Sequence, residues 1–244
     1  MFIKNRLGLI ESVETMLAQT QRLNQVSNNL ANVDTAGYKR DNVTFWEMLY
    51  TTSSNQQRVG KALQVATDFQ AGPIEETGNP LDLAISGEGF FRIQTPQGVR
   101  YTRDGNFHLN NQGQLTTTNG HLLLGQGGGP IVIEGNKMVV NPDGAVIVDG
   151  EQVSKVAVVT FAELSSLEKE GYNLFRVKSP DIQEQQAQGV EVKQGFLEGS
   201  NVNVVKEMTD MIDLFRAFEA QQRAISTVND MDGIAVNRVG KLTS

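Results

Sequence analysis

Pairs of carboxylates are the first residues in this sequence whose types and spacing could carry chemistry. Asp82 with Glu88, or Glu75 with Glu76, could act as acid and base in glycoside cleavage. The chain is acidic, with a net charge of −7 over 244 residues, and solvent-exposed carboxylates are common on such a surface. His108 lies in a strand-like pattern and has no nucleophile-bearing Gly-x-Ser-x-Gly turn beside it. We therefore expect no catalytic residue and no enzymatic activity.

Metal and cofactor sites find as little support. The chain has no cysteine and two histidines, which argues against thiolate ligands and against a multi-histidine centre. Asp34, Asp41 and Asp68 lack the spacing of a calcium loop. The glycine-rich run 125–130 ends in a proline and has no Lys-Ser or Lys-Thr after it, so it does not match a phosphate loop. We expect no metal, no cofactor and no small-molecule substrate.

Charge and hydropathy exclude further classes of protein. The negative net charge argues against nucleic acid or an anionic membrane as the main partner. No apolar run reaches the roughly 18 residues of a membrane span. Glu11 and Glu14 interrupt the apolar region that a cleaved secretion signal needs, so we expect export without a signal peptide.

Glycine and proline divide the chain into three parts. All six prolines and 19 of the 24 glycines lie within residues 72–199, where they mark turns. At both ends, apolar residues recur at steps of three and four, the period of an amphipathic helix. The sequence predicts a helix over residues 1–35, an extended connector over 36–74, a β domain over 75–198 and a second helix over 199–244.

Turn glycines set the pattern of the middle part. Gly98, Gly105, Gly113 and Gly120 are seven or eight residues apart, with short apolar segments between them. This spacing is typical of short antiparallel strands joined by tight turns. Asp104-Gly105 is a hairpin-type dipeptide, so we expect a positive φ angle at Gly105. The predicted fold class is α+β, with a discontinuous, coiled-coil-like domain of both terminal helices and a central all-β domain.

Asparagines mark one face of the first predicted helix. Asn24, Asn28 and Asn32 are four residues apart and share a stripe, with Asn29 beside it. Asparagine is a poor helix former, so such a stripe favours polar contacts between packed helices. A plain solvated stripe is the alternative. We expect the helix to end before Gly37, which suits a left-handed cap.

Five blocks along the chain resemble the bacterial flagellar rod and hook protein family. They are SNNLANVDTAGYK at 27–39, TGNPLDLAISGEGFF at 77–91, YTRDGNF at 101–107, LEGSNV at 197–202 and EMTDMI at 207–212. The blocks follow the family's order and span nearly the whole chain. The resemblance favours a proximal rod protein. The alternatives are a distal rod or hook-type protein, a surface adhesin, or a secreted hydrolase on a β scaffold.

This resemblance implies a structural component of the flagellar basal body. Members of the family leave the cell through the flagellar type III export apparatus and polymerise into a rod that crosses the periplasm and transmits torque. The implied partners are further copies of the chain, other rod subunits and the export apparatus.

The expected assembly interface lies on the two terminal helices. An isolated amphipathic helix is only marginally stable in water, so its apolar face must be covered by the other helix or by a neighbouring subunit. The interface residues we expect are Leu23, Asn24, Asn28, Asn29, Leu30, Asn32, Met208, Met211, Ile212, Phe215, Phe218 and Ile225.

Overall fold

The computed structural model describes residues 2–51 and 57–241, which form two compact units. The helical unit contains α1 (Phe2–Ala31), β1 (Asp41–Thr51), β2 (Gln57–Thr67) and α2 (Val204–Lys241). The last residue of β2, Thr67, already belongs to the β unit. Residues 32–40 and 67–202 form the β unit. Helices at both ends and strands between them confirm the predicted α+β class.

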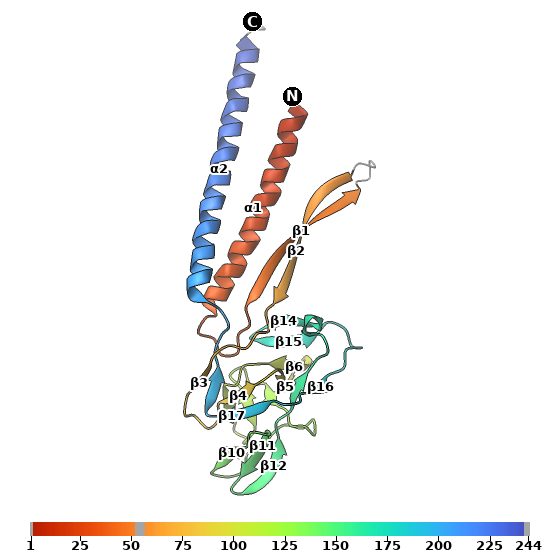
Figure 1. Cartoon of the computed structure of the whole chain (residues 1–244), viewed down its shortest axis with the longest axis vertical. Coiled ribbons are helices and arrows are strands. Elements are labelled where there is room, and N and C mark those ends of the chain that lie inside the picture. Colours follow the sequence, from red (N-terminus) through yellow and green to blue (C-terminus); the bar gives the residue numbers. More distant parts are fainter. Residues whose placement is uncertain (1, 52–56, 242–244) are drawn as a thin grey trace. The chain divides into compact units, whose positions relative to one another are not determined.

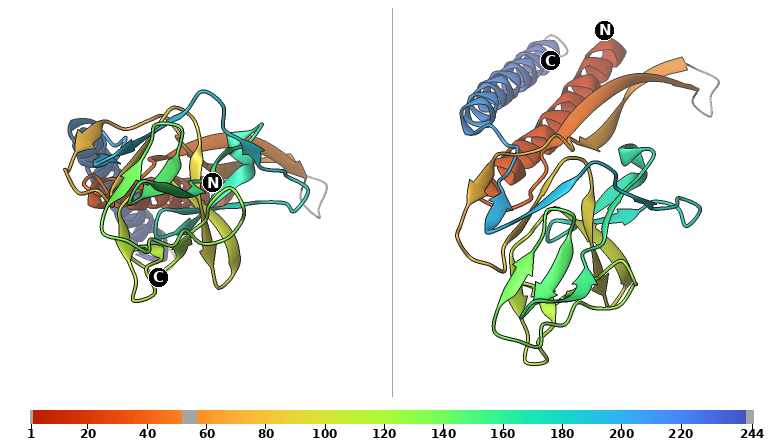
Figure 2. Two further views of the ribbon diagram at one scale, coloured as in Figure 1. Left: turned by 90° about the horizontal axis from the view of Figure 1, so that it is seen from below. Right: turned by 60° about the horizontal axis from the view of Figure 1, so that its bottom comes forward.

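In the helical unit, α1 and α2 lie side by side and run in opposite directions (Figure 1 and Figure 2). Each helix carries a row of buried or half-buried residues at alternating steps of three and four. In α1 these are Met16, Gln19, Leu23, Val26 and Leu30, and in α2 Glu207, Met211, Leu214, Phe218, Gln221, Ile225 and Val228. Such alternation is typical of a coiled-coil seam. We call these residues the inner stripe.

The ends of the helices differ in part from the prediction. Asn203 caps α2, since its Oδ1 accepts a hydrogen bond of 3.0 Å from the Lys206 amide. The first helix ends at Ala31, four residues before the predicted boundary, and residues 32–40 belong to the β unit. Within the described residues, neither helix is long and apolar enough to cross a membrane.

Strands β1 and β2 pair with each other in a two-stranded sheet of their own (Figure 1). They occupy most of residues 36–74, for which the sequence analysis expected only an extended connector. The segment between Asp41 and Thr51 contains Val43, Phe45, Trp46 and Tyr50, which are residue types enriched in strands. The prediction gave more weight to the polar residues around them.

The β unit consists of short strands in four sheets, and within it the described strands pair in antiparallel fashion. Along the largest sheet the strands follow the order β14 (Leu167–Gly171), β15 (Leu174–Val177), β6 (Gly98–Thr102), β5 (Phe90–Thr95), β9 (Leu122–Leu123), β8 (Leu115–Thr117), β7 (Phe107–Leu109). Beside β5 lies β13 (Val158–Thr160), which also pairs with β16 (Gln185–Gln186). A second sheet contains β10 (Met138–Val140), β11 (Ala145–Val148) and β12 (Glu151–Lys155), and a short 3₁₀ helix spans Leu164–Ser166.

Two further sheets join the beginning of the β unit to its end. β3 (Ile74–Glu76) pairs with β18 (Phe196–Glu198), and β4 (Leu83–Ser86) pairs with β17 (Glu191–Gln194). These pairings bring together residues more than 100 positions apart, and they place Glu198 opposite Ile74. The last strands of the unit are therefore held in place by the first.

Two apolar clusters form the core of the β unit. The larger contains Leu83, Phe91, Ile93 and Phe107 among its fully buried side chains, with the Phe91 and Phe107 rings 5.3 Å apart. The smaller is centred on Phe90 and Phe175. Since most of these residues lie within the predicted short strands, the prediction of a β core holds.

The turn glycines follow the prediction with one exception. Gly98, Gly113 and Gly120 have positive φ angles, as hairpin turns require. Gly105 does not, so the predicted hairpin at this position is wrong. Its backbone instead lies against Leu83, whose amide donates a 3.0 Å hydrogen bond to the Gly105 carbonyl, and a Cβ atom at Gly105 would lie 1.6 Å from the Leu83 oxygen. Close approach of two chain segments, and not φ, requires glycine here.

We expect Gly105→Ala to lower the free energy of unfolding of the β unit by about 2–3 kcal/mol, because the new methyl group forces two backbones apart. Chemical denaturation of the full chain measures this. Gly127→Ala is the control, since a Cβ at Gly127 meets nothing within 4 Å. Equal stability of the two variants would contradict the proposed backbone contact.

Candidate functional site

The segment 32–40, which follows α1 in the chain, is anchored in the β unit by Gly37. Its φ angle is 66°, left-handed as predicted, but α1 already ends at Ala31, so Gly37 does not form the predicted cap of the helix. The Gly37 amide donates a 2.7 Å hydrogen bond to the Glu198 carbonyl. A Cβ on Gly37 would lie 2.3 Å from the backbone of Arg103 and Asp104. Glycine therefore allows three distant segments of the chain to meet.

Two residues after Gly37, a buried ionic cluster joins the same three segments. The Lys39 ammonium lies 2.6 Å from one oxygen of Glu198, and the Arg103 guanidinium 3.0 Å from the other. The side chains of Lys39 and Glu198 are each 1% exposed, and that of Arg103 is 4% exposed. We call these three residues the ionic cluster.

Backbone groups satisfy further polar atoms of the cluster, while Arg103 Nε is buried without a hydrogen-bond partner among the described residues. Lys39 Nζ also donates to the Gln70 carbonyl at 2.7 Å, and Arg103 donates to the carbonyls of Ile85 and Gly87. The Gly72 amide donates to Glu198 at 2.9 Å. A buried ion pair is tolerated only when such additional hydrogen bonds replace the lost water.

Glu198 is the central residue of the ionic cluster, because its carboxylate pairs with both cations. Burial lowers the pKa of the Lys39 ammonium below its usual 10.5, and the nearby Glu198 carboxylate opposes that shift. One carboxylate thus compensates two buried cations, and the Arg103 guanidinium also lies 5.5 Å from the centre of the Phe90 ring. Loss of Glu198 would leave both cations unpaired.

Neighbouring contacts attach the same segment more widely. Lys169 Nζ donates to the Lys39 carbonyl at 2.7 Å and lies 4.0 Å from the centre of the Tyr38 ring. The Arg40 amide donates to Asn201 Oδ1 at 2.7 Å, and the Asn201 amide group donates to the Asp68 carbonyl. The chain segments that lead to α1 and to α2 are therefore bound to each other within the β unit.

The helical unit has a polar contact of its own, but the predicted asparagine stripe does not make it. Asn29 is fully buried, and its Nδ2 donates to the Asp41 carbonyl at 3.0 Å and to Glu207 Oε2 of α2 at 3.3 Å. Asn24 and Asn28 are exposed, and Asn32 lies in the β unit. Asn29, beside the predicted stripe, therefore makes this contact with α2, and polar contacts of the stripe itself with packed helices stay a prediction.

The apolar residues of the expected interface separate into two groups. Leu23, Leu30, Met211, Phe218 and Ile225 are half-buried in the inner stripe. Met208, Ile212 and Phe215 are exposed on another face of α2. The apolar period predicted one common face for them all, since steps of three and four alone do not distinguish neighbouring rows on a helix.

The candidate catalytic carboxylates do not come together as a reactive pair. Asp82 is buried and accepts hydrogen bonds from Thr77 Oγ1 at 2.7 Å and from Asn79 Nδ2 at 3.1 Å, so it stabilises the turn before β4. Glu88 and His108 are exposed. Across residues 2–51 and 57–241, no group of three or more histidines and carboxylates is arranged to hold a metal ion.

The ionic cluster was not predicted from the sequence. Its only signal was that Lys39, Arg103 and Glu198 each lie in one of the five blocks, at 27–39, 101–107 and 197–202. No local pattern indicates that charges 64 and 95 positions apart share one buried site.

Comparison with known proteins finds three family models along this chain. Residues 12–39 match the model described as "Flagella basal body rod protein". Residues 84–148 match "Flagellar hook protein FlgE/F/G D1 domain", and residues 193–238 match "Flagellar basal body rod FlgEFG protein C-terminal". The three matches contain all three members of the ionic cluster.

Individual relatives match over almost the full length. The chain is 35% identical to the flagellar basal-body rod protein FlgG of Bacillus subtilis, over 92% of this chain and 96% of that protein. It is 34% identical to the rod protein FlgF of Caulobacter vibrioides, over 96% and 98% of the two chains. It is 32% identical to FlgF of Rhizobium meliloti, over 87% of this chain and 89% of that protein.

Proposed function

Since the chain belongs to the family of flagellar basal-body rod proteins, we propose that it builds the rod through contacts between copies of its terminal helices. Its family was predicted from the five blocks and is confirmed by the matches. The chain is a structural component of the rod, located in the flagellar basal body.

One observation carries the proposal about the helices: a row of large apolar residues on α2 is exposed to solvent. Val205, Met208, Ile212 and Phe215 are 75%, 50%, 51% and 49% exposed. They recur at steps of three and four along one face, next to the inner stripe. We call them the outer stripe. Contiguous exposed apolar surface of this kind marks an interaction site.

Neighbouring subunits would cover this stripe in the assembled rod. Val13 and Leu17 of α1 and Met231 and Ile234 of α2 are exposed as well, so apolar surface is available along both helices. Burial of apolar surface contributes roughly 25 cal/mol per Å², and in this case only when a neighbour is present. The helix pair then has an inner stripe that holds it together and an outer surface for assembly.

The partners and the route follow from this role. We propose that the chain contacts further copies of itself and other rod subunits, is exported by the flagellar export apparatus without a cleaved signal, and crosses the periplasm as part of the rod. Family membership supports these statements. Relatives named FlgG and FlgF match at 35% and 34% identity, so a distal and a proximal position are both compatible with the comparisons.

We also propose that the chain has no catalytic role. The carboxylate with the best candidate geometry, Asp82, already accepts two hydrogen bonds from side chains of its own turn. The other candidates lie on the exposed surface.

Deletion of the gene and complementation test this function. We expect the deletion strain to be non-swimming and the intact chain to restore swimming. His108→Ala and Glu88→Ala chains should restore it as well, because neither residue lies on the terminal helices that we propose for assembly. Loss of swimming with His108→Ala or Glu88→Ala, at normal amounts of folded protein, would favour the hydrolase alternative.

A further inference from the structure

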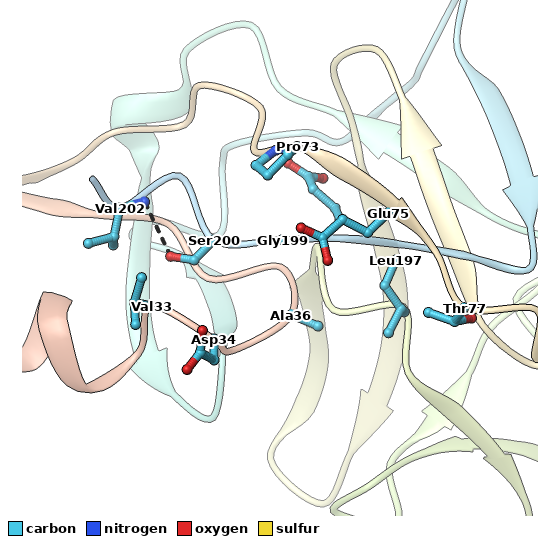
Figure 3. Close-up of a pocket in the computed structure, with 11 residues that line it drawn as sticks. Val33, Asp34, Ala36, Pro73, Glu75, Thr77, Leu197, Gly199, Ser200 and Val202 are labelled. Atoms are coloured by element: carbon cyan, nitrogen blue, oxygen red, sulfur yellow. Dashed lines mark hydrogen bonds between the residues drawn. The ribbon is translucent and has the colours of Figure 1, made fainter. Parts of the chain in front are cut away.

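The β unit contains a pocket of about 420 Å³ beside the ionic cluster (Figure 3). One part of its lining is apolar, with Val33, Pro73 and Leu197. The side chains of Asp34 and Glu75 also line it. Among the described residues, neither carboxylate has a hydrogen-bonding or ion-pairing side-chain partner. The pocket therefore combines an apolar surface with two uncompensated negative charges.

A strained and exposed tyrosine, Tyr172, is the chain neighbour of a residue that contacts the pocket lining. Tyr172 and Asn173 form the turn between β14 and β15 with φ angles of 50° and 56°. Asn173 Nδ2 donates to the carbonyl of Ala36, a residue of the pocket lining, at 3.0 Å. Tyr172 itself is 79% exposed.

Folding of the turn does not explain a tyrosine at this position. Glycine or asparagine adopts a positive φ angle with little strain, whereas a bulky side chain does not. The turn is held rigidly, because the Asn173 carbonyl also accepts a 2.8 Å hydrogen bond from Thr102 Oγ1. An exposed aromatic ring on a rigid support loses little entropy when a partner binds it.

The chemistry of the pocket fits a cationic side chain with an apolar neighbour. Carboxylates pair with arginine, the aliphatic stem of arginine packs on apolar surface, and an exposed aromatic ring attracts its guanidinium. α2 presents such a combination, since Arg216 is exposed directly after Phe215 and one turn after Ile212 of the outer stripe.

We propose that the Phe215–Arg216 edge of α2 from a second copy of this chain docks into the pocket, with Arg216 facing Asp34 and Glu75. The proposal rests on the proposed function and adds to it the surface that receives the outer stripe. Pocket and helix edge are different surfaces of one chain, so the contact is heterologous. Heterologous contacts that do not close into a ring produce an open helical polymer, as a rod requires.

Charge reversal in the full chain, produced in the deletion strain, tests this pairing. We expect Glu75→Arg and Arg216→Glu each to lower the amount of the chain in purified basal bodies by about tenfold or more, because like charges then face each other. Glu76→Arg and Arg223→Glu are the matched controls. Glu76 is the exposed next residue on β3 and does not line the pocket, and Arg223 is exposed two turns further along α2.

Co-production of the two single variants is the decisive measurement. If the contact joins different copies, each reversed pocket can receive a reversed helix, and alternating copies should restore both assembly and swimming. Normal assembly of the single variants would overturn the proposal. So would single variants that are folded and fail to assemble, but are not rescued by co-production.

Tyr172→Gly separates this role from folding. The variant should raise the thermal midpoint of the β unit by about 2–4 °C through loss of strain, and should weaken assembly. A variant that assembles normally would contradict the role of the ring. Ile225→Asp in the inner stripe tests the proposed function independently: if it blocks assembly while Arg216→Glu does not, only the docking proposal fails.

Discussion

Glu198→Gln is expected to lower the free energy of unfolding of the β unit by about 3–5 kcal/mol. Glutamine has nearly the same shape, so the change removes one negative charge and creates little cavity. Lys39 and Arg103, which are 1% and 4% exposed, then lie buried without a compensating carboxylate. Chemical denaturation of the full chain, followed by the near-UV signal of the β unit, measures the loss.

Glu191→Gln is the matched control for this variant. Glu191 lies on β17, close in sequence to Glu198, and its side chain is exposed. We expect a change within about 0.5 kcal/mol for the control. A change of similar size in both variants, or a loss below about 1 kcal/mol for Glu198→Gln, would show that the ionic cluster does not hold the three segments together.

The second large effect is a contrast between the two stripes of α2. Ile225→Asp places a carboxylate in the half-buried seam with α1, and burial of an unpaired charge costs several kcal/mol. We expect reduced helical content and loss of swimming, and the same for Leu30→Asp. Ile212→Asp changes an exposed residue, so the isolated chain should keep its helical content and still fail to swim.

Far-UV circular dichroism of the purified chain and swimming of the complemented deletion strain provide the two measurements. Gln222→Asp, on an exposed and polar part of α2, serves as the control and should swim normally. If Ile212→Asp swims normally, the outer stripe is not an assembly surface. If Ile225→Asp retains full helicity, the inner stripe does not stabilise the helix pair.

Much of the fold was predictable because its signals are local. The apolar period of three and four residues marks both helices, and the glycine spacing marks the turns at Gly98, Gly113 and Gly120. Local signals gave a wrong prediction where tertiary packing determines the backbone conformation. The dipeptide Asp104-Gly105 is typical of a turn, but Gly105 instead packs its backbone closely against Leu83. No spacing in the sequence indicates this contact.

The candidate site was less predictable because its members are distant in sequence. Lys39, Arg103 and Glu198 meet only after β3 has paired with β18 and Gly37 has allowed the backbones to approach. Likewise, the apolar period predicted Ile212 and Ile225 as interface residues, but only the packing of α1 on α2 separates an inner from an outer row. The same period is compatible with either face.

Protection of residue 212 in the assembled rod tests the central claim most directly. The chain has no cysteine, so a single Ile212→Cys thiol gives an unambiguous signal with a maleimide reagent. Asp181→Cys, at an exposed position of the β unit, reports the reactivity of an open surface. We predict that the residue-212 thiol reacts readily in the isolated chain and at least about tenfold more slowly in purified basal bodies, relative to the residue-181 thiol. Equal relative reactivity in the isolated chain and in the basal body would contradict assembly through the outer stripe.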